Sequence, residues 1–148
     1  MTDIDISTIG FTKTSASRFF ERIKKAGVTK VVDVRLHNTS QLAGFAKAED
    51  LAYFLKEICQ VPYVHEPRLA PTDDILKAYK RDKGDWNLYQ NQFMKLMAER
   101  KIENRLQPAE LQGACLLCSE ATPHHCHRRL VCDYLNEKWA GGLKVRHL

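Results

Sequence analysis

The most reactive part of this chain is the segment CSEATPHHCHR, which runs from Cys118 to Arg128. Cys118 closes an apolar run typical of a buried strand, and Cys126 follows a Thr-Pro pair typical of a helix start. The free N–H groups of a first helical turn favour a bound anion and lower the pKa of a nearby thiol. Glu120 adds a carboxylate that can act as a general base or orient a partner. The segment therefore predicts an active site, with Cys118 as the first candidate nucleophile and Cys126 as the second.

These two cysteines allow three interpretations. Thiol catalysis fits no familiar signature, because His124 stands where a tyrosine-phosphatase loop needs an arginine. A metal site could combine Cys118, Cys126 and His127, with His124 or His65 as a further ligand. The seven residues between the cysteines exceed the usual spacing of zinc motifs, so we assign no metal ligands from the sequence. In the third interpretation both thiols are small buried hydrophobic residues.

Alternating strand and helix patterns predict which distant residues reach this segment. Predicted strands cover residues 4–10, 28–34, 61–65, 113–118 and 145–148. Four helices are predicted. The first begins at a cap at position 14, 15 or 17 and ends at 26. The others cover 49–59, 72–101 with a break near 84, and 122–139. The alternation predicts the α/β class: residues 1–148 form a single three-layer α/β/α domain with a mainly parallel sheet of about five strands.

Ligands of such sheets bind at the carboxyl ends of the strands. Asp33 and Arg35 stand at the end of the second predicted strand, and His65 ends the third. Cys118 and Glu120 stand at the end of the fourth, so we expect all five residues near one edge of the sheet. A stripe at helical spacing is interpreted as core packing instead; it consists of Trp86, Tyr89, Phe93 and Met97.

The composition excludes several classes of protein. Five cysteines, an odd number, and the absence of an export pattern near Met1 favour a reducing, cytoplasmic compartment over a disulfide framework. No apolar stretch approaches the roughly 20 residues of a membrane helix, so we expect no membrane partner. The net charge of +5 mildly favours anionic partners, a small molecule or a nucleic acid, although many small domains carry such a surplus without a function. Because Gly-rich phosphate loops are also absent, no cofactor is assigned.

Several of these motifs occur together in one known family. Over residues 6–148 the chain resembles the domain of unknown function 488 family in Thr8-Ile9-Gly10, Asp33-Val34-Arg35, Tyr63-Val64-His65, and Leu117-Cys118-Ser119-Glu120 leading to Cys126-His127-Arg128. The Cys-x-Glu motif followed by Cys-His-Arg is the specific part. The resemblance implies a compact α/β domain and a pocket near Gly10, Asp33, Arg35, Cys118, Glu120, Cys126, His127 and Arg128. It implies no activity, and the chain departs from common relatives at Phe11 and at Leu69-Ala70-Pro71.

The leading functional hypothesis is an enzyme that acts on an anionic, phosphate-bearing substrate such as a nucleotide or a nucleic-acid fragment. Arg35 and Arg128 would hold the anion, because a guanidinium matches phosphate oxygens. Asp33 or Glu120 would act as the general base or orient a partner. The alternative is a non-catalytic module that binds a nucleotide, a nucleic acid or a protein, or a Cys/His metal-binding domain. In the non-catalytic module, buried ion pairs would only hold the loops.

Overall fold

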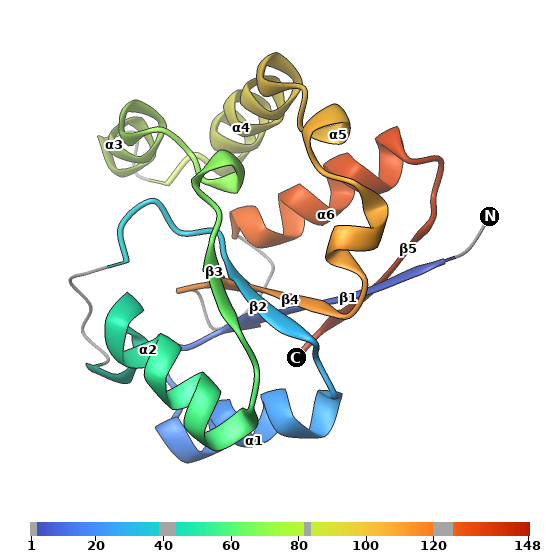
Figure 1. The fold of residues 1–148 in the computed structure, drawn as a ribbon. Helices are drawn as coiled ribbons and strands as arrows, with labels where there is room; N and C mark the ends of the chain where they lie inside the picture. Colours follow the sequence, from blue (N-terminus) through green and yellow to red (C-terminus); the bar gives the residue numbers. More distant parts are fainter. Residues whose placement is uncertain (1–2, 39–43, 82–83, 120–125) are drawn as a thin grey trace.

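One parallel sheet forms the centre of this protein (Figure 1). The computed structural model describes residues 3–38, 44–81, 84–119 and 126–148, and within them five strands pair in the order β3-β2-β4-β1-β5. These strands are β1 (Ile4–Gly10), β2 (Lys30–Asp33), β3 (Tyr63–His65), β4 (Ala114–Cys118) and β5 (Leu143–His147). Every neighbouring pair is parallel, which confirms the predicted α/β class.

Helices fill the connections between the strands. They are α1 (Ala16–Ala26), α2 (Ala48–Phe54), continued by the π-helical turn η2 (Leu55–Cys59), α3 (Asp73–Arg81), α4 (Trp86–Arg100), α5 (Ile102–Arg105) and α6 (His127–Lys138). Short 3₁₀ turns add η1 (Gly44–Ala46), η3 (Pro67–Leu69) and η4 (Pro108–Leu111). Ser15 caps α1 by accepting a hydrogen bond from the Arg18 amide, as one of the three predicted caps. Helix α6 begins at His127, and its predicted start at residue 122 lies outside the described residues.

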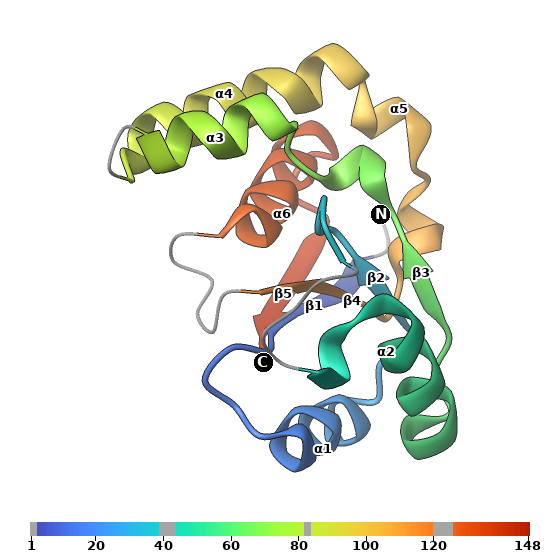
Figure 2. The ribbon, with the colours of Figure 1, turned by 90° about the vertical axis from the view of Figure 1, so that its left-hand side faces the viewer.

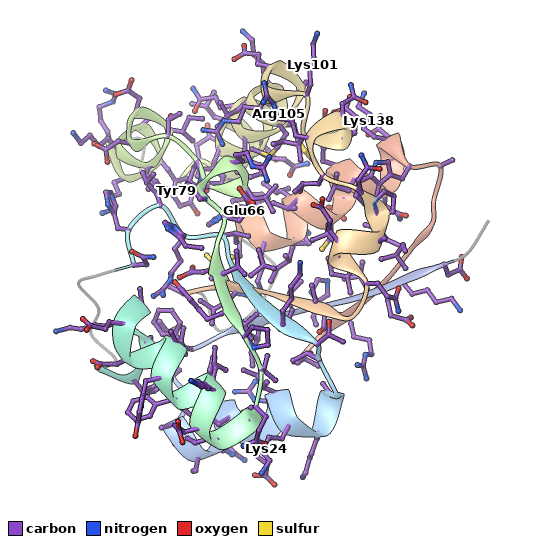
Figure 3. All side chains as sticks on the ribbon, viewed as in Figure 1. Lys24, Glu66, Tyr79, Lys101, Arg105 and Lys138 are labelled. Atoms are coloured by element: carbon purple, nitrogen blue, oxygen red, sulfur yellow. The ribbon has the colours of Figure 1, made fainter. Side chains whose placement is uncertain are left out.

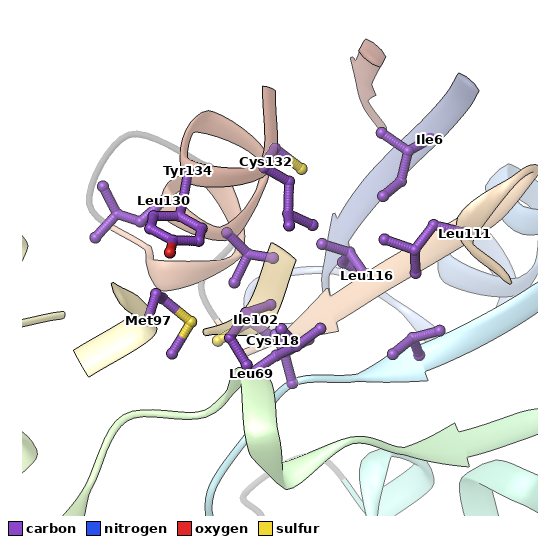
Figure 4. Close-up of a cluster of buried hydrophobic side chains, with 14 of the residues drawn as sticks. Ile6, Leu69, Met97, Ile102, Leu111, Leu116, Cys118, Leu130, Cys132 and Tyr134 are labelled. Carbon is purple, nitrogen blue, oxygen red and sulfur yellow. The ribbon is translucent and has the colours of Figure 1, made fainter. Parts of the chain in front are cut away.

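The two faces of the sheet carry different helices. Helices α1 and α2 cover one face, and α3 to α6 cover the other, as Figure 1 and the turned view in Figure 2 both show. Because side chains alternate along a strand, β4 serves both hydrophobic cores. Cys115 and Leu117 pack toward α1 and α2, whereas Leu116 and Cys118 pack toward the opposite layer. Figure 4 shows Cys118 within that second core, near Ile102 and Leu69.

Charged side chains lie on the outer side of the layer formed by α3 to α6. Lys101, Arg105 and Lys138 are exposed, and Lys101 projects outward from the helices in Figure 3. Among the described residues, no helix is both long and apolar enough to cross a membrane.

The strand order opens a crevice at the carboxyl end of β4. Strand β4 lies between β1 and β2, and the helices that follow these two neighbours pack on the α1/α2 face. Helix α6, which follows β4, packs on the other face. After β4 the chain therefore turns to one face of the sheet, whereas after β1 and β2 it turns to the other. Ligands of parallel sheets bind at such points.

Candidate functional site

Two sulfurs and an imidazole meet at the carboxyl end of β4. Cys118 is the last residue of the strand, and Cys126 is the extended N-cap residue directly before α6. His127 is the first residue of that helix. One donor atom from each of these three residues lies within 4.8 Å of the others, and all three residues are buried. The structure thus brings together a cluster whose members are separated by up to nine positions in the sequence.

A backbone carbonyl fixes the orientation of the His127 ring. Nε2 of His127 lies 2.6 Å from the carbonyl oxygen of Val34, which can only accept, so Nε2 carries the hydrogen. In the neutral ring the lone pair is then on Nδ1, which lies 3.6 Å from Sγ of Cys118. The same sulfur is 3.9 Å from Nε2, but the hydrogen of that nitrogen is directed toward Val34. Phe93 packs against the imidazole with ring centroids 5.5 Å apart.

Arg128 reaches the cluster from the side of β1. Its side chain is fully buried, with Nε 3.1 Å from Oγ1 of Thr8 and Nη1 3.6 Å from Sγ of Cys126. The hydroxyl of Thr8 also contacts Nδ1 of His147 at 2.6 Å. The predicted role of Arg128 as an anion ligand remains a prediction; the observed contacts instead direct its charge toward a sulfur.

The pKa of the Cys126 thiol is shifted in the opposite direction to the sequence prediction. The neighbouring Cys118 thiol and then burial raise the pKa of Cys126 well above its ordinary value, against smaller opposite effects of His127 and Arg128. The field of a helix N-terminus was expected to lower this pKa. A second thiol in contact and the loss of water outweigh that field, because both disfavour a negative charge in a buried site.

Asp33 holds Arg35 in a buried ion pair. The Asp33 oxygens accept from Nε of Arg35 at 2.9 Å, from Nη2 at 2.7 Å, and from the Arg35 amide at 3.1 Å. The hydroxyl of Tyr63 donates to the same carboxylate at 2.5 Å. Burial, followed by this bond to Asp33, raises the pKa of Tyr63 to about 12. Four contacts occupy the acceptor positions of a fully buried carboxylate, so Asp33 orients Arg35.

Two other predicted site residues, His65 and Gly10, contact members of this arrangement and are not among the residues that line the pocket described next. Nε2 of His65 donates to the carbonyl oxygen of Arg35 at 2.8 Å and so fixes the backbone there. Gly10 pairs with Cys118 across β1 and β4. Glu120, predicted as a catalytic carboxylate, lies outside the described residues.

A pocket of about 350 Å³ opens above the cluster. Its floor contains Cys118, Ser119, Cys126, His127 and Arg35. Arg35 is 4% exposed, and its Nη1 has no hydrogen-bond partner among the described residues. The other two guanidinium nitrogens are bonded to Asp33, and the guanidinium carbon lies 5.0 Å from the centroid of the Phe11 ring.

Helices α3 and α4 supply the opposite wall, which the sequence analysis missed as part of a site. The wall consists of Leu76, Tyr79, Trp86 and Tyr89, with Leu36, His37 and Lys80 completing the lining. Trp86 stacks on Tyr89 with ring centroids 5.2 Å apart. The predicted core stripe is confirmed: Tyr89, Phe93 and Met97 are buried in the core, and Trp86 is half-buried, packs against it and also lines the pocket. The available signal was the presence of three aromatic residues between positions 79 and 89, around the helix break.

A larger groove of about 590 Å³ lies over α1 and α2. Its apolar floor includes Phe20, Phe45 and Phe54, and among the described residues neither a cysteine nor a histidine lines it. Chemistry depends on reactive groups more than on volume, so we take the smaller pocket above Cys118 as the candidate site.

Comparison with known proteins identifies the family. Neither the curated proteins nor the solved structures contain a match to this chain. The family model described as "Domain of unknown function DUF488" matches residues 15–135, which include β2, β4 and the Cys118 to Arg128 segment. The match covers most of the 148 residues, and the chain belongs to the DUF488 family.

Proposed function

We propose that this protein is an enzyme that acts on an anionic, phosphate-bearing substrate, a nucleotide or a nucleic-acid fragment, in the pocket above Cys118. One observation carries the proposal: Cys118, His127 and Arg35 come from three chain segments and line the same pocket of about 350 Å³. Small-molecule sites have volumes of this order and combine apolar walls with a few convergent polar groups.

Arg35 binds the anion in this proposal. Its Nε and Nη2 are bonded to Asp33, which fixes the plane of the guanidinium, and its Nη1 is left for the ligand. A phosphate oxygen at that nitrogen would satisfy a buried donor whose isolation costs about 1–3 kcal/mol. Asp33 therefore acts as a positioning residue, and Lys80 adds positive charge to the pocket lining.

The aromatic wall receives the uncharged part of the substrate. Tyr79, Trp86 and Tyr89 line the pocket together with the sulfur-containing residues. A planar base stacked on such rings gains about 1–3 kcal/mol. A ligand with both a planar ring and a phosphate would use the wall and Arg35 together, which supports a nucleotide over inorganic phosphate.

Cys118 and His127 supply the reactive floor, and Cys126 lies beside them. Arg128 orients the Cys126 sulfur and does not line the pocket. Glu120 stays a predicted catalytic residue, which Glu120→Gln would test by its effect on turnover.

The test compares Arg35→Lys with Arg68→Lys. Lysine at position 35 keeps a cation beside Asp33 but lacks the second arm of the guanidinium, whereas Arg68 is an exposed residue paired with Glu66 outside the pocket. Calorimetric titration with nucleoside monophosphates, the matching nucleosides and inorganic phosphate measures binding. We expect tighter binding of the nucleotides, and a loss of roughly 10–100-fold for Arg35→Lys only, from one or more charge-assisted bonds.

Turnover is followed by mass spectrometry of nucleotides and short oligonucleotides incubated with the protein. Binding without any product would favour the alternative, a non-catalytic binding module. The proposal fails if no phosphate-bearing ligand binds, or if Arg35→Lys binds as tightly as Arg68→Lys.

A further inference from the structure

We propose that Cys118, Cys126 and His127 together bind one thiophilic divalent metal ion, Zn²⁺ in the first instance, and that the described residues leave one of its coordination positions open toward the pocket. This inference adds a metal ion to the proposed active site, and any catalytic role of that ion rests on the proposed function. Nothing in the metal site itself depends on the identity of the substrate.

The distances match a tetrahedral centre. Zinc binds thiolate sulfur at about 2.3 Å and imidazole nitrogen at about 2.0–2.1 Å, so a tetrahedral angle holds the two ligand atoms about 3.6 Å apart. Sγ of Cys118 and Nδ1 of His127 are 3.6 Å apart. All three donor atoms lie within 4.8 Å of one another, so one ion can reach them with small side-chain rotations.

The histidine is already in the form that a metal requires. Its Nε2 donates to the Val34 carbonyl, which leaves the lone pair on Nδ1, the nitrogen nearer the Cys118 sulfur. Histidine ligands of metals almost always make such a bond from the other ring nitrogen, which fixes both the tautomer and the ring direction. Packing of Phe93 against the same ring holds it from the other side.

The buried charges also fit a metal ion. Two thiolates and a divalent ion sum to zero, and the Nη1 group of Arg128 donates to the Cys126 sulfur from outside the cluster. A donor to a ligating sulfur is a normal outer-shell contact and withdraws charge from the thiolate. Arg128 is anchored through Thr8 and needs no movement to make this contact.

The protein supplies three ligands among the described residues, and all three line the pocket. Zinc sites with three protein ligands and an open position are typically catalytic, whereas structural zinc sites are closed by a fourth ligand. When bound, such an ion polarises a substrate oxygen or lowers the pKa of a bound water. Arg35, in the same pocket, would hold the anionic part of the substrate near this open position.

The test is titration of reduced, metal-free protein with Co²⁺. We expect about one ion per chain, with thiolate-to-cobalt charge-transfer absorption and the intense visible bands of a tetrahedral site. Cys118→Ala and Cys126→Ala should weaken binding by more than about tenfold, since even outer-shell changes cost roughly 10–100-fold. Cys132→Ala is the matched control, because Cys132 is a buried cysteine of the same helix outside the cluster. It should keep the wild-type spectrum and affinity.

A second measurement needs only the wild-type chain. Alkylation followed by peptide mapping, with and without Zn²⁺, should show metal-dependent protection of Cys118 and Cys126, with no metal-dependent change at Cys59. A wild-type chain that gives no charge-transfer band under reducing conditions would overturn the inference, as would equal affinities of Cys118→Ala and Cys132→Ala. Metal binding can succeed while nucleotide binding fails, and the reverse, so the two proposals are tested separately.

Discussion

Replacing Asp33 by asparagine should destabilise the protein strongly, because it leaves the Arg35 charge without a counter-charge. The carboxylate is fully buried and accepts from Nε and Nη2 of Arg35 at 2.9 and 2.7 Å, and from Tyr63 at 2.5 Å. Asparagine has nearly the same shape, but its NH₂ group would face donors. Breaking a buried ion pair from one side costs about 3–5 kcal/mol. For a chain of this size each kcal/mol shifts Tm by about 2–4 °C, so we expect a loss of roughly 6–20 °C.

Thermal and urea unfolding followed by circular dichroism measure this effect. Asp73→Asn is the matched control, since Asp73 is exposed and its ion-pair partners among the described residues, His37 and Lys77, have exposed side chains. That variant should unfold close to the wild-type midpoint. The double variant Asp33→Asn/Arg35→Met should recover part of the loss, because it removes the uncompensated charge. If Asp33→Asn cost less than about 1 kcal/mol, a typical value for an ordinary substitution, the reasoning about this ion pair would be wrong.

Two further predictions follow from single contacts. The pKa of Tyr63 is raised from 10 to about 12, so its contribution to stability is complete below pH 10 and is lost as the pH rises from 10 to 12. Tyr63→Phe should be less stable than the wild-type chain at neutral pH. Between pH 10 and 12 it should lose less stability than the wild-type chain, as urea unfolding at several pH values would show. Gly113 has a φ of +76°, and an added Cβ would lie 2.8 Å from two atoms of Thr29. Gly113→Ala should therefore lower the free energy of unfolding more than Gly27→Ala. Gly27 also has a positive φ, but an added Cβ there meets open space, so its substitution should cost only the backbone penalty of about 1–2 kcal/mol. Equal Tm values of the two variants would contradict this.

The local signals in the sequence were sufficient for most of the fold. Ser15 and Gly27 bound α1 as capping rules predict, and Pro62 precedes β3, which is an edge strand of the sheet. Cys115 and Cys118 pack on opposite faces of β4, as the alternation of a strand requires. These features depend on neighbouring residues, so no long-range information is needed to predict them.

The site was only partly predictable because its geometry depends on distant contacts. The carbonyl of Val34 selects the His127 tautomer, and Thr8 anchors Arg128 across about 120 positions of sequence. No spacing rule covers such pairs. The same limit applies to the proposed metal site: zinc motifs assume ligands on one short loop, whereas here a strand end and a helix start would supply them.

If the chain binds the proposed ion, its removal should leave the chain folded, because contacts within the fold hold two of the ligands without the ion. Cys118 is held by pairing with Gly10, and His127 by Val34, so the donor atoms are close together in the polypeptide itself. Small zinc domains behave differently, since metal binding drives their folding. At a free metal concentration about 100 times the Kd, the ion adds about 2.7 kcal/mol to stability. We therefore expect a chelator to lower Tm by roughly 5–11 °C while the far-ultraviolet circular dichroism at 25 °C stays unchanged. Unfolding of the wild-type chain on chelation would show that the ion builds the site, and the argument from preorganised ligands would then fail.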